Sequence, residues 1–225
     1  MGIPGRPGPL VLAHRGDHRR TVENTLAAFR SALAAPGCDG LEFDVRLSAD
    51  GVPVVLHDET VARIHGRPGR AAELGAEELA GLGIPSLAEV LRAAPAPAFL
   101  DVELKIDTGP AAVEVLRAAR GPRLGRAVVS SFDVVALETV RALEPGWPCW
   151  LNAVDLAPAT IELAVRLGCL GISADWRAID ERAARRVDRA GLILAAWTVT
   201  RRPTLARLAR LGVAAVCVEG AALTG

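Results

Sequence analysis

The chain holds a single lysine, Lys105, in the run Asp101-Val102-Glu103-Leu104-Lys105, while arginine supplies every other long basic side chain. Because side chains along a strand alternate between its two faces, Glu103 and Lys105 would project to the same face. Lysine carries a compact ammonium that the planar fork of arginine does not replace. Such a pair could hold a metal ion together with the phosphate that the ion neutralises. The alternative is an intrastrand ion pair on a solvated face.

A predicted β-hairpin brings further polar side chains together. The segments Leu41–Leu47 and Val52–His57 are both extended, and Asp50-Gly51 between them is a strong hairpin signal. With Asp50 and Gly51 as the two turn residues, His57 would lie opposite Asp44. A slip of one or two residues would still leave these groups close. The hairpin therefore gathers three side chains: Glu42, Asp44 and His57.

Ionisable residues also cluster by chain position, at the carboxyl ends of the first three predicted strands. Oxygen ligands without cysteine favour one hard divalent cation, Mg²⁺ or Ca²⁺. Histidines titrate near neutral pH and can act as a general acid and base, and cationic side chains can clamp phosphodiester oxygens. The candidates are Glu42, Asp44 and Glu103 for the metal, His14 and His57 for proton transfer, and Arg15 and Lys105 for phosphate.

Short apolar runs alternate with amphipathic stretches along the chain, which is the pattern of βα units. Eight such runs within this length favour a closed (β/α)8 barrel over an open doubly wound sheet. The segment Glu59–Gly83 is long enough for a short cap only, and no helix is expected after the last strand. The predicted strands are Leu10–His14, Leu41–Val45, Ala98–Leu104, Arg126–Ser131, Pro148–Asn152, Cys169–Ser173, Leu192–Thr198 and Ala214–Val218.

Two helix starts can be predicted from capping residues. Asn24 or Thr25 would cap the first helix, and Asn24 is expected to be a helix cap rather than a ligand. Ser86-Leu87-Ala88-Glu89 has the form of a capping box. Glu23 is expected to orient Arg15, and His18 to be a solvated loop residue.

Composition excludes several classes of partner. The formal net charge is zero, so the chain has no basic footprint for nucleic acid. No apolar run reaches membrane-spanning length, and the residues before Leu10 lack the apolar core of a signal peptide. Cysteines without metal spacing are expected to be reduced core thiols.

We expect a flexible tail over residues 1–9, one domain over residues 10–225 and a cytoplasmic location. The oligomeric state is left open.

Ordered motifs run through nearly the whole chain. They are Ala13-His14-Arg15-Gly16, Glu23-Asn24-Thr25-Leu26-Ala27-Ala28-Phe29, Asp39-Gly40-Leu41-Glu42-Phe43-Asp44-Val45, Asp50-Gly51-Val52-Pro53-Val54-Val55-Leu56-His57-Asp58, Val102-Glu103-Leu104-Lys105, Ser130-Ser131-Phe132-Asp133 and Trp197-Thr198-Val199. Each motif is weak alone, but the ordered set resembles the glycerophosphodiester phosphodiesterases.

That resemblance implies hydrolysis of small-molecule glycerophosphodiesters to glycerol 3-phosphate and an alcohol, within glycerol and lipid metabolism. It implies the same roles for the metal, histidine and phosphate residues as those named above. Trp197 would either wall the alcohol pocket or pack in the core. The chain departs from the family at Val22, at Asp17-His18-Arg19-Arg20 and at Thr200, which leaves substrate choice open. The alternatives are a lysophospholipase D acting on lipid substrates and a catalytically silent barrel that binds metal or phosphate.

Overall fold

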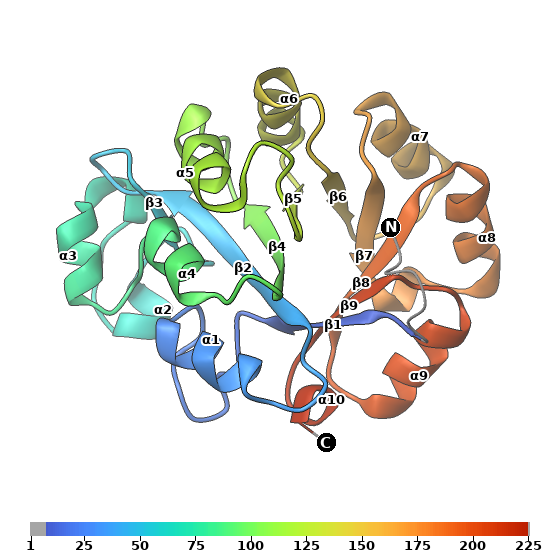
Figure 1. The fold of residues 1–225 in the computed structure, drawn as a ribbon, viewed down its shortest axis with the longest axis horizontal. Helices are drawn as coiled ribbons and strands as arrows, with labels where there is room; N and C mark the ends of the chain where they lie inside the picture. Colours follow the sequence, from blue (N-terminus) through green and yellow to red (C-terminus); the bar gives the residue numbers. More distant parts are fainter. Residues whose placement is uncertain (1–7, 225) are drawn as a thin grey trace.

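A computed structural model describes residues 8–224 and shows a closed barrel surrounded by helices (Figure 1). Its sheet has nine strands, of which β3 (Pro53–Val55) lies outside the ring. The remaining eight strands are parallel, and β1 closes the ring by pairing with both β2 and β9. These strands are β1 (Leu10–His14), β2 (Gly40–Leu47), β4 (Phe99–Leu104), β5 (Ala127–Ser131), β6 (Cys149–Ala153), β7 (Gly171–Asp175), β8 (Ile193–Val199) and β9 (Ala215–Val218).

The predicted (β/α)8 barrel is therefore confirmed, and each predicted strand is present with its ends shifted by two residues at most. The predicted tail, residues 1–9, lies outside the described residues except for Gly8 and Pro9. Within residues 8–224, no helix is both long and apolar enough to cross a membrane.

Helices follow the strands and cover the outside of the barrel. The expectation that no helix follows the last strand was wrong, because a single turn, α10 (Ala221–Thr224), forms there. Its first bonds run from the Ala222 amide to the Glu219 carbonyl and from the Thr224 amide to the Gly220 carbonyl. The other barrel helices are α1 (Leu26–Leu33), α4 (Leu87–Ala93), α5 (Pro110–Arg120), α6 (Val134–Leu143), α7 (Pro158–Arg166), α8 (Glu181–Arg189) and α9 (Arg202–Arg210).

The two predicted helix starts are present with one correction. Thr25, not Asn24, is the N-cap of α1, and its hydroxyl accepts a hydrogen bond from the Ala28 amide at 3.3 Å. Ser86 and Glu89 form the predicted capping box at the start of α4. Asn24, whose backbone has a positive φ of 57°, makes a different contact.

The hairpin after β2 has a register one residue away from the predicted one. Leu47 pairs with Pro53, so Ser48 and Val52 close a three-residue loop in place of the two-residue turn. Gly51 takes the left-handed conformation at φ 76°, as three-residue hairpin loops require. Asp44 consequently lies opposite Leu56, whose amide donates to the Asp44 carbonyl, and His57 is one residue further along.

A short cap lies between β3 and α4, as predicted. It contains α2 (Ala62–His65), a 3₁₀ turn η1 (Ala71–Glu73) and α3 (Ala76–Gly81). The cap has a small apolar cluster of its own, formed by Val54, Leu56, Val61, Ala71, Leu74, Leu79 and Ile84.

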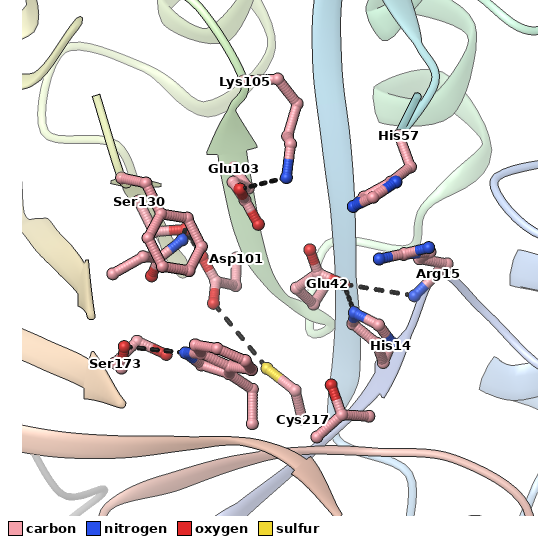
Figure 2. Close-up of a pocket in the computed structure, with 14 residues that line it drawn as sticks. His14, Arg15, Glu42, His57, Asp101, Glu103, Lys105, Ser130, Ser173 and Cys217 are labelled. Atoms are coloured by element: carbon pink, nitrogen blue, oxygen red, sulfur yellow. Dashed lines mark hydrogen bonds and ion pairs between the residues drawn. The ribbon is translucent and has the colours of Figure 1, made fainter. Parts of the chain in front are cut away.

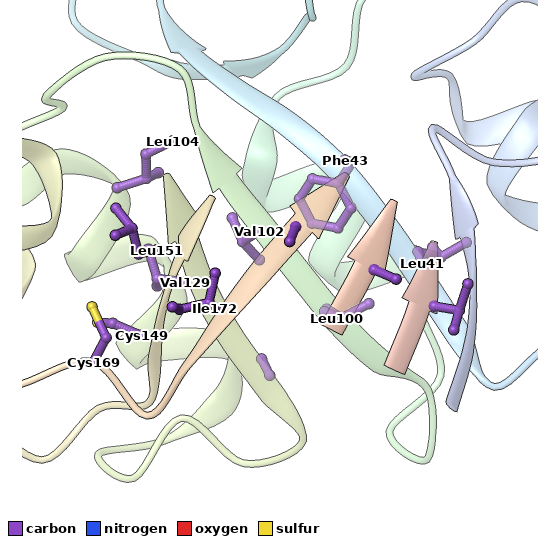
Figure 3. Close-up of a cluster of buried hydrophobic side chains, with 14 of the residues drawn as sticks. Leu41, Phe43, Leu100, Val102, Leu104, Val129, Cys149, Leu151, Cys169 and Ile172 are labelled. Carbon is purple, nitrogen blue, oxygen red and sulfur yellow. The ribbon is translucent and has the colours of Figure 1, made fainter. Parts of the chain in front are cut away.

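Strand alternation separates the core from the site. On β2 and β4 the residues Leu41, Phe43, Leu100, Val102 and Leu104 belong to the main core between sheet and helices (Figure 3). The intervening residues point into the barrel, and they are acidic: Glu42, Asp44, Asp101 and Glu103. A second, smaller apolar cluster that includes Leu12, Val128, Trp150 and Ala215 packs inside the ring. The same period of two that builds the core therefore places carboxylates inside the barrel.

Candidate active site

Three buried carboxylates meet inside the barrel. Glu42 and Asp44 lie on β2, and Glu103 lies on β4 directly beside Asp44 in the sheet register. The exposed fractions of Glu42, Asp44 and Glu103 are 4%, 0% and 8%. One oxygen from each lies within 4.8 Å of the others, so the three could hold one metal ion.

The electrostatics of this cluster fit a cation. Burial and the charges of Asp44 and Glu103 raise the pKa of Glu42 well above its ordinary value. Burial and the charge of Asp44 raise the pKa of Glu103. Glu42 Oε1 and Asp44 Oδ1 are buried without a hydrogen-bond partner. Buried carboxylates with unused oxygens are stabilised by a hard divalent cation, so the residues present fit one.

Two cationic side chains border the cluster, each near a different oxygen of Asp44. Lys105 Nζ donates to Glu103 Oε1 at 2.6 Å and lies 3.6 Å from Asp44 Oδ1. Arg15 Nε lies 3.2 Å from Asp44 Oδ2, and Arg15 Nη1 donates to Glu23 Oε1 at 3.0 Å. Glu23 thus contacts Arg15 in the way that the sequence indicated. Both cations face the space above the carboxylates (Figure 2).

The loop after β1 is bent sharply to place Arg15. Arg15 has a φ of 56°, and its amide donates to the Glu42 carbonyl at 2.9 Å. A side chain on Gly16 would approach the Ala28 carbonyl carbon to 2.7 Å, so only glycine fits there. Asn24 Nδ2 donates to Asp44 Oδ2 at 2.8 Å. Asn24 therefore orients a carboxylate of the cluster instead of capping α1, which corrects the sequence expectation.

His57 lies at the cap side of the site. Its Nδ1 is 2.6 Å from Asp58 Oδ1, and Asp58 also accepts a hydrogen bond from Arg63. The hydrogen bond from Arg63 lowers the pKa of Asp58 to about 2. Burial lowers the pKa of His57, which favours the neutral imidazole. Asp58 therefore stays ionised and fixes one nitrogen of the ring.

His14 lies at the end of β1, on the other side of the carboxylate cluster. Its Nδ1 is 2.5 Å from Glu219 Oε1, and its Nε2 is 3.7 Å from Glu42 Oε2. The hydrogen bond from His14 and the nearby His18 imidazole hold the pKa of Glu219 below its usual range. His18 Nε2 lies 3.6 Å from Glu219 Oε1, and this contact raises the pKa of His18. His18 is thus a half-buried partner of a carboxylate, not the solvated loop residue expected.

Sequence reasoning missed Glu219. The residue directly follows β9, so the rule that active-site residues lie at the carboxyl ends of barrel strands could have found it. The interpretation applied that rule to the first three strands and not to the last one.

A cavity of about 260 Å³ joins these groups (Figure 2). Its lining includes His14, His57 and both cations, so the structure brings the predicted site residues to one place. Asp44 alone is absent from the lining and lies behind it. Trp197 lines the cavity as well, where its Nε1 donates to the Ser173 carbonyl at 2.8 Å.

Asp101 and several neutral and aromatic residues form the rest of the cavity. Phe132 packs edge-on against Trp197 with ring centroids 5.5 Å apart. Ser130 Oγ donates to Asp101 Oδ1 at 2.6 Å, and burial raises the pKa of Asp101 to about 7. Asn152 also lines the cavity. Among these, Asp101 and Asn152 carried no sequence signal beyond strand alternation.

Comparisons with known proteins identify the family of the chain. The profile of the "Glycerophosphoryl diester phosphodiesterase family" matches residues 14–221. A glycerophosphodiester phosphodiesterase of Caldanaerobacter subterraneus subsp. tengcongensis is 30% identical, and the match covers 93% of each chain. A similar relative from Bacillus subtilis is 26% identical over 92% of this chain and 82% of its own.

Solved structures give the same result. An Oleispira antarctica phosphodiesterase in complex with the product sn-glycerol-3-phosphate has a TM-score of 0.83 and 28% identity, covering 93% of this chain and 92% of its own. The glycerophosphodiester phosphodiesterase of Thermotoga maritima has a TM-score of 0.79 and 26% identity, covering 95% of both chains. The chain therefore belongs to the glycerophosphoryl diester phosphodiesterase family and is a phosphoric diester hydrolase.

Proposed function

We propose that this chain hydrolyses glycerophosphodiesters to glycerol 3-phosphate and an alcohol, with one divalent cation and two histidines. The observation that carries the proposal is the paired arrangement of imidazoles around one acidic cluster. His14 and His57 each have Nδ1 within 2.6 Å of a carboxylate oxygen, and both line the cavity that also contains Glu42 and Glu103.

Glu42, Asp44 and Glu103 would hold one Mg²⁺ or Ca²⁺. When bound, the ion would neutralise phosphate charge and so favour attack on phosphorus. Glu42 Oε1 and Asp44 Oδ1 accept no hydrogen bond, which supports this assignment, since a cation could coordinate both oxygens.

Arg15 and Lys105 would contact the non-bridging phosphate oxygens. Arg15 already has Glu23 and Asp44 as partners, which fix the direction of its guanidinium. Lys105 is held between Glu103 and Asp44, so its remaining donor directions face the cavity. Donors that are fixed before the reaction stabilise developing charge without reorganising.

The two imidazoles would move the protons. One removes the proton from the attacking oxygen, which belongs either to water or to the substrate's own glycerol hydroxyl. In the second case a cyclic glycerol phosphate forms, and water then opens it to glycerol 3-phosphate. The other gives its proton to the alkoxide as the phosphorus–oxygen bond to the alcohol breaks. Each ring would work through Nε2, because Nδ1 is engaged by Glu219 in His14 and by Asp58 in His57.

Cavity size favours a small alcohol over a lipid. A more open, largely apolar groove of about 570 Å³ does exist between α1 and the cap, with Val22, Leu26 and Ile84 in its lining. That groove shares no lining residue with the catalytic cavity. We therefore favour deacylated glycerophosphodiesters over the lysophospholipase D alternative. A silent binding barrel would need no second imidazole held by a carboxylate.

The test compares two reactions, each measured before and after chelation. One is the release of glycerol 3-phosphate from glycerophosphocholine, and the other is the release of acylated glycerol 3-phosphate from lysophosphatidylcholine. We expect turnover of glycerophosphocholine that chelation abolishes and Mg²⁺ or Ca²⁺ restores. Full activity after thorough chelation would refute the metal assignment, and a preference for lysophosphatidylcholine would refute the substrate class.

Amide variants of the acidic cluster separate a metal role from a structural one. Without metal, Glu42→Gln should unfold at a higher temperature than the parent, because it removes one of three mutually repelling buried charges. Added Mg²⁺ or Ca²⁺ should raise the melting temperature of the parent more than that of the variant. Equal shifts in both proteins would contradict a cation at this cluster.

A further inference from the structure

Two imidazoles lie near one carboxylate oxygen of Glu219, one at hydrogen-bond distance and the other at ion-pair distance. His14 Nδ1 is 2.5 Å and His18 Nε2 is 3.6 Å from the same Oε1 atom. The backbone of Glu219 is fixed at the end of β9, because its amide donates to the Val199 carbonyl at 2.9 Å and its carbonyl accepts from Ala222. The side chain is 28% exposed, so its carboxylate has room to turn toward solvent unless a partner holds it.

The contact with Glu219 selects one form of His14. A carboxylate only accepts hydrogen bonds, so Nδ1 of His14 must carry a proton. In the neutral ring this leaves Nε2 as the free nitrogen, and Nε2 is the atom that lies toward Glu42 and the cavity. Loss of the carboxylate would allow the other tautomer and a rotated ring.

The loop after β1 holds His18 where it can act on Glu219. The Asp17 amide donates to the Ala28 carbonyl at 3.0 Å, and the Asp17 carboxylate accepts from Ser31 at 3.1 Å. These bonds tie the residue before His18 to α1. The charges that act on the His18 imidazole are those of Glu219, Glu23 and Arg15.

We propose that Glu219 is a positioning residue for His14, and that His18 holds the Glu219 carboxylate in place for that task. The chain of contacts runs from His18 to Glu219 to His14, with only His14 facing the reacting atoms. This inference rests on the proposed function, because it assigns the residues that aim one of the two proposed catalytic imidazoles.

The decisive experiment is a double-mutant cycle on steady-state turnover of glycerophosphocholine. We expect Glu219→Gln to lower kcat by roughly tenfold to a hundredfold, less than the loss of the imidazole itself, with KM within about threefold of the parent. In the His14→Ala background, Glu219→Gln should cause no further loss, since the residue acts only through His14. Equal fractional losses in both backgrounds would overturn the inference.

His18→Ala should show the same pattern with a smaller decrease in kcat. We expect a loss of roughly threefold to tenfold in kcat, and none once Glu219 is already glutamine. An undiminished loss from His18→Ala in the Glu219→Gln background would refute the role given to His18. Glu219→Asp, which keeps a carboxylate on a shorter arm, should recover part of the activity that glutamine loses.

Two further measurements exclude a structural explanation. Nitrogen-15 NMR of the imidazoles should show His14 protonated at Nδ1 in the parent and a mixture of tautomers in Glu219→Gln. The control variant Glu59→Gln changes an exposed cap glutamate that pairs with Arg70, and it should leave both kcat and the His14 signal unchanged. An unaltered His14 signal in Glu219→Gln would contradict positioning.

The outcomes separate this inference from the proposed function. Normal turnover in His14→Ala would reject the catalytic histidine and the inference with it. A severe loss in His14→Ala together with normal turnover in Glu219→Gln would reject the inference alone.

Discussion

The two sides of the barrel mouth have different chemistry. The side built by β1, β2 and β4 carries the acidic cluster, both proposed phosphate contacts and His14, whereas the side built by β5, β6 and β7 offers Ser130, Asn152 and Ser173. Phe132 and Trp197 extend the neutral side toward solvent. A substrate with one charged and one neutral end would be oriented by this difference. Substitutions on the charged side should therefore lower kcat, and those on the neutral side should mainly raise KM.

The largest expected effect is on the two imidazoles. His14→Ala and His57→Ala should each lower kcat by about 10²–10⁴-fold, because each would remove a proposed general acid or base. The double variant should be little worse than either single one, since the two groups act as a unit. Steady-state kinetics with circular dichroism as a folding control checks this. Near-normal turnover in either single variant would remove that histidine from the mechanism.

Lys105 gives the next largest effect on the charged side. Lys105→Met should lose a few hundredfold in rate, since a donor to developing charge contributes about 2.7–4 kcal/mol. Lys105→Arg should also be severely impaired, because the wider planar head would displace neighbours of Glu103 and Asp44. If Lys105→Arg keeps turnover within about threefold of the parent, the lysine only pairs with Glu103 at the barrel rim.

A substitution on the neutral side should behave differently. Trp197→Phe removes the Nε1 donor to the Ser173 carbonyl and reduces contact with Phe132. We expect KM for glycerophosphocholine to rise by up to roughly tenfold, the equivalent of about 1.4 kcal/mol, with kcat nearly unchanged.

Trp176→Phe is the matched control for this change. Trp176 packs against Arg207 outside the cavity, so its replacement should leave both kinetic constants unchanged. A large fall in kcat for Trp197→Phe would show that the two sides do not divide binding and chemistry as described.

The smallest effect concerns stability and its pH dependence. The hydrogen bond from Arg19 lowers the pKa of Asp17 to about 2. A carboxyl whose folded pKa lies below its unfolded value of about 3.9 stabilises the protein above pH 4, and the contribution disappears as pH falls toward 2. Asp17→Asn should therefore lower the free energy of unfolding at pH 7 by about 1 kcal/mol, and by almost nothing near pH 2.

Urea denaturation at both pH values checks this prediction, with turnover measured alongside. The exposed Asp188→Asn serves as the control and should match the parent at both pH values. A pH-independent difference between parent and Asp17→Asn would show that the Asp17 charge is not the cause.

The sequence alone determined the barrel and most of the candidate site. Period-two alternation predicts that Glu42 and Asp44 share one face of their strand and that Glu103 and Lys105 share one face of theirs. Parallel strands in a barrel bring these carboxyl ends to one side. The position of Lys105 beside Glu103 was likewise predictable, because both residues belong to one short segment. These are local regularities of the sequence, and the order of βα units along the chain determines where they lie in the folded barrel.

Only the tertiary structure decided the contacts that depend on ring closure and on exact register. Glu219 meets His14 across 205 positions because β1 pairs with β9, and no local pattern specifies which side chains meet at that seam. The hairpin register differs from the predicted one because its loop has three residues in place of two. Asn24, which has a positive φ, donates to Asp44 and does not cap α1. Such contacts are set by the packing of whole elements, which short-range sequence patterns do not encode.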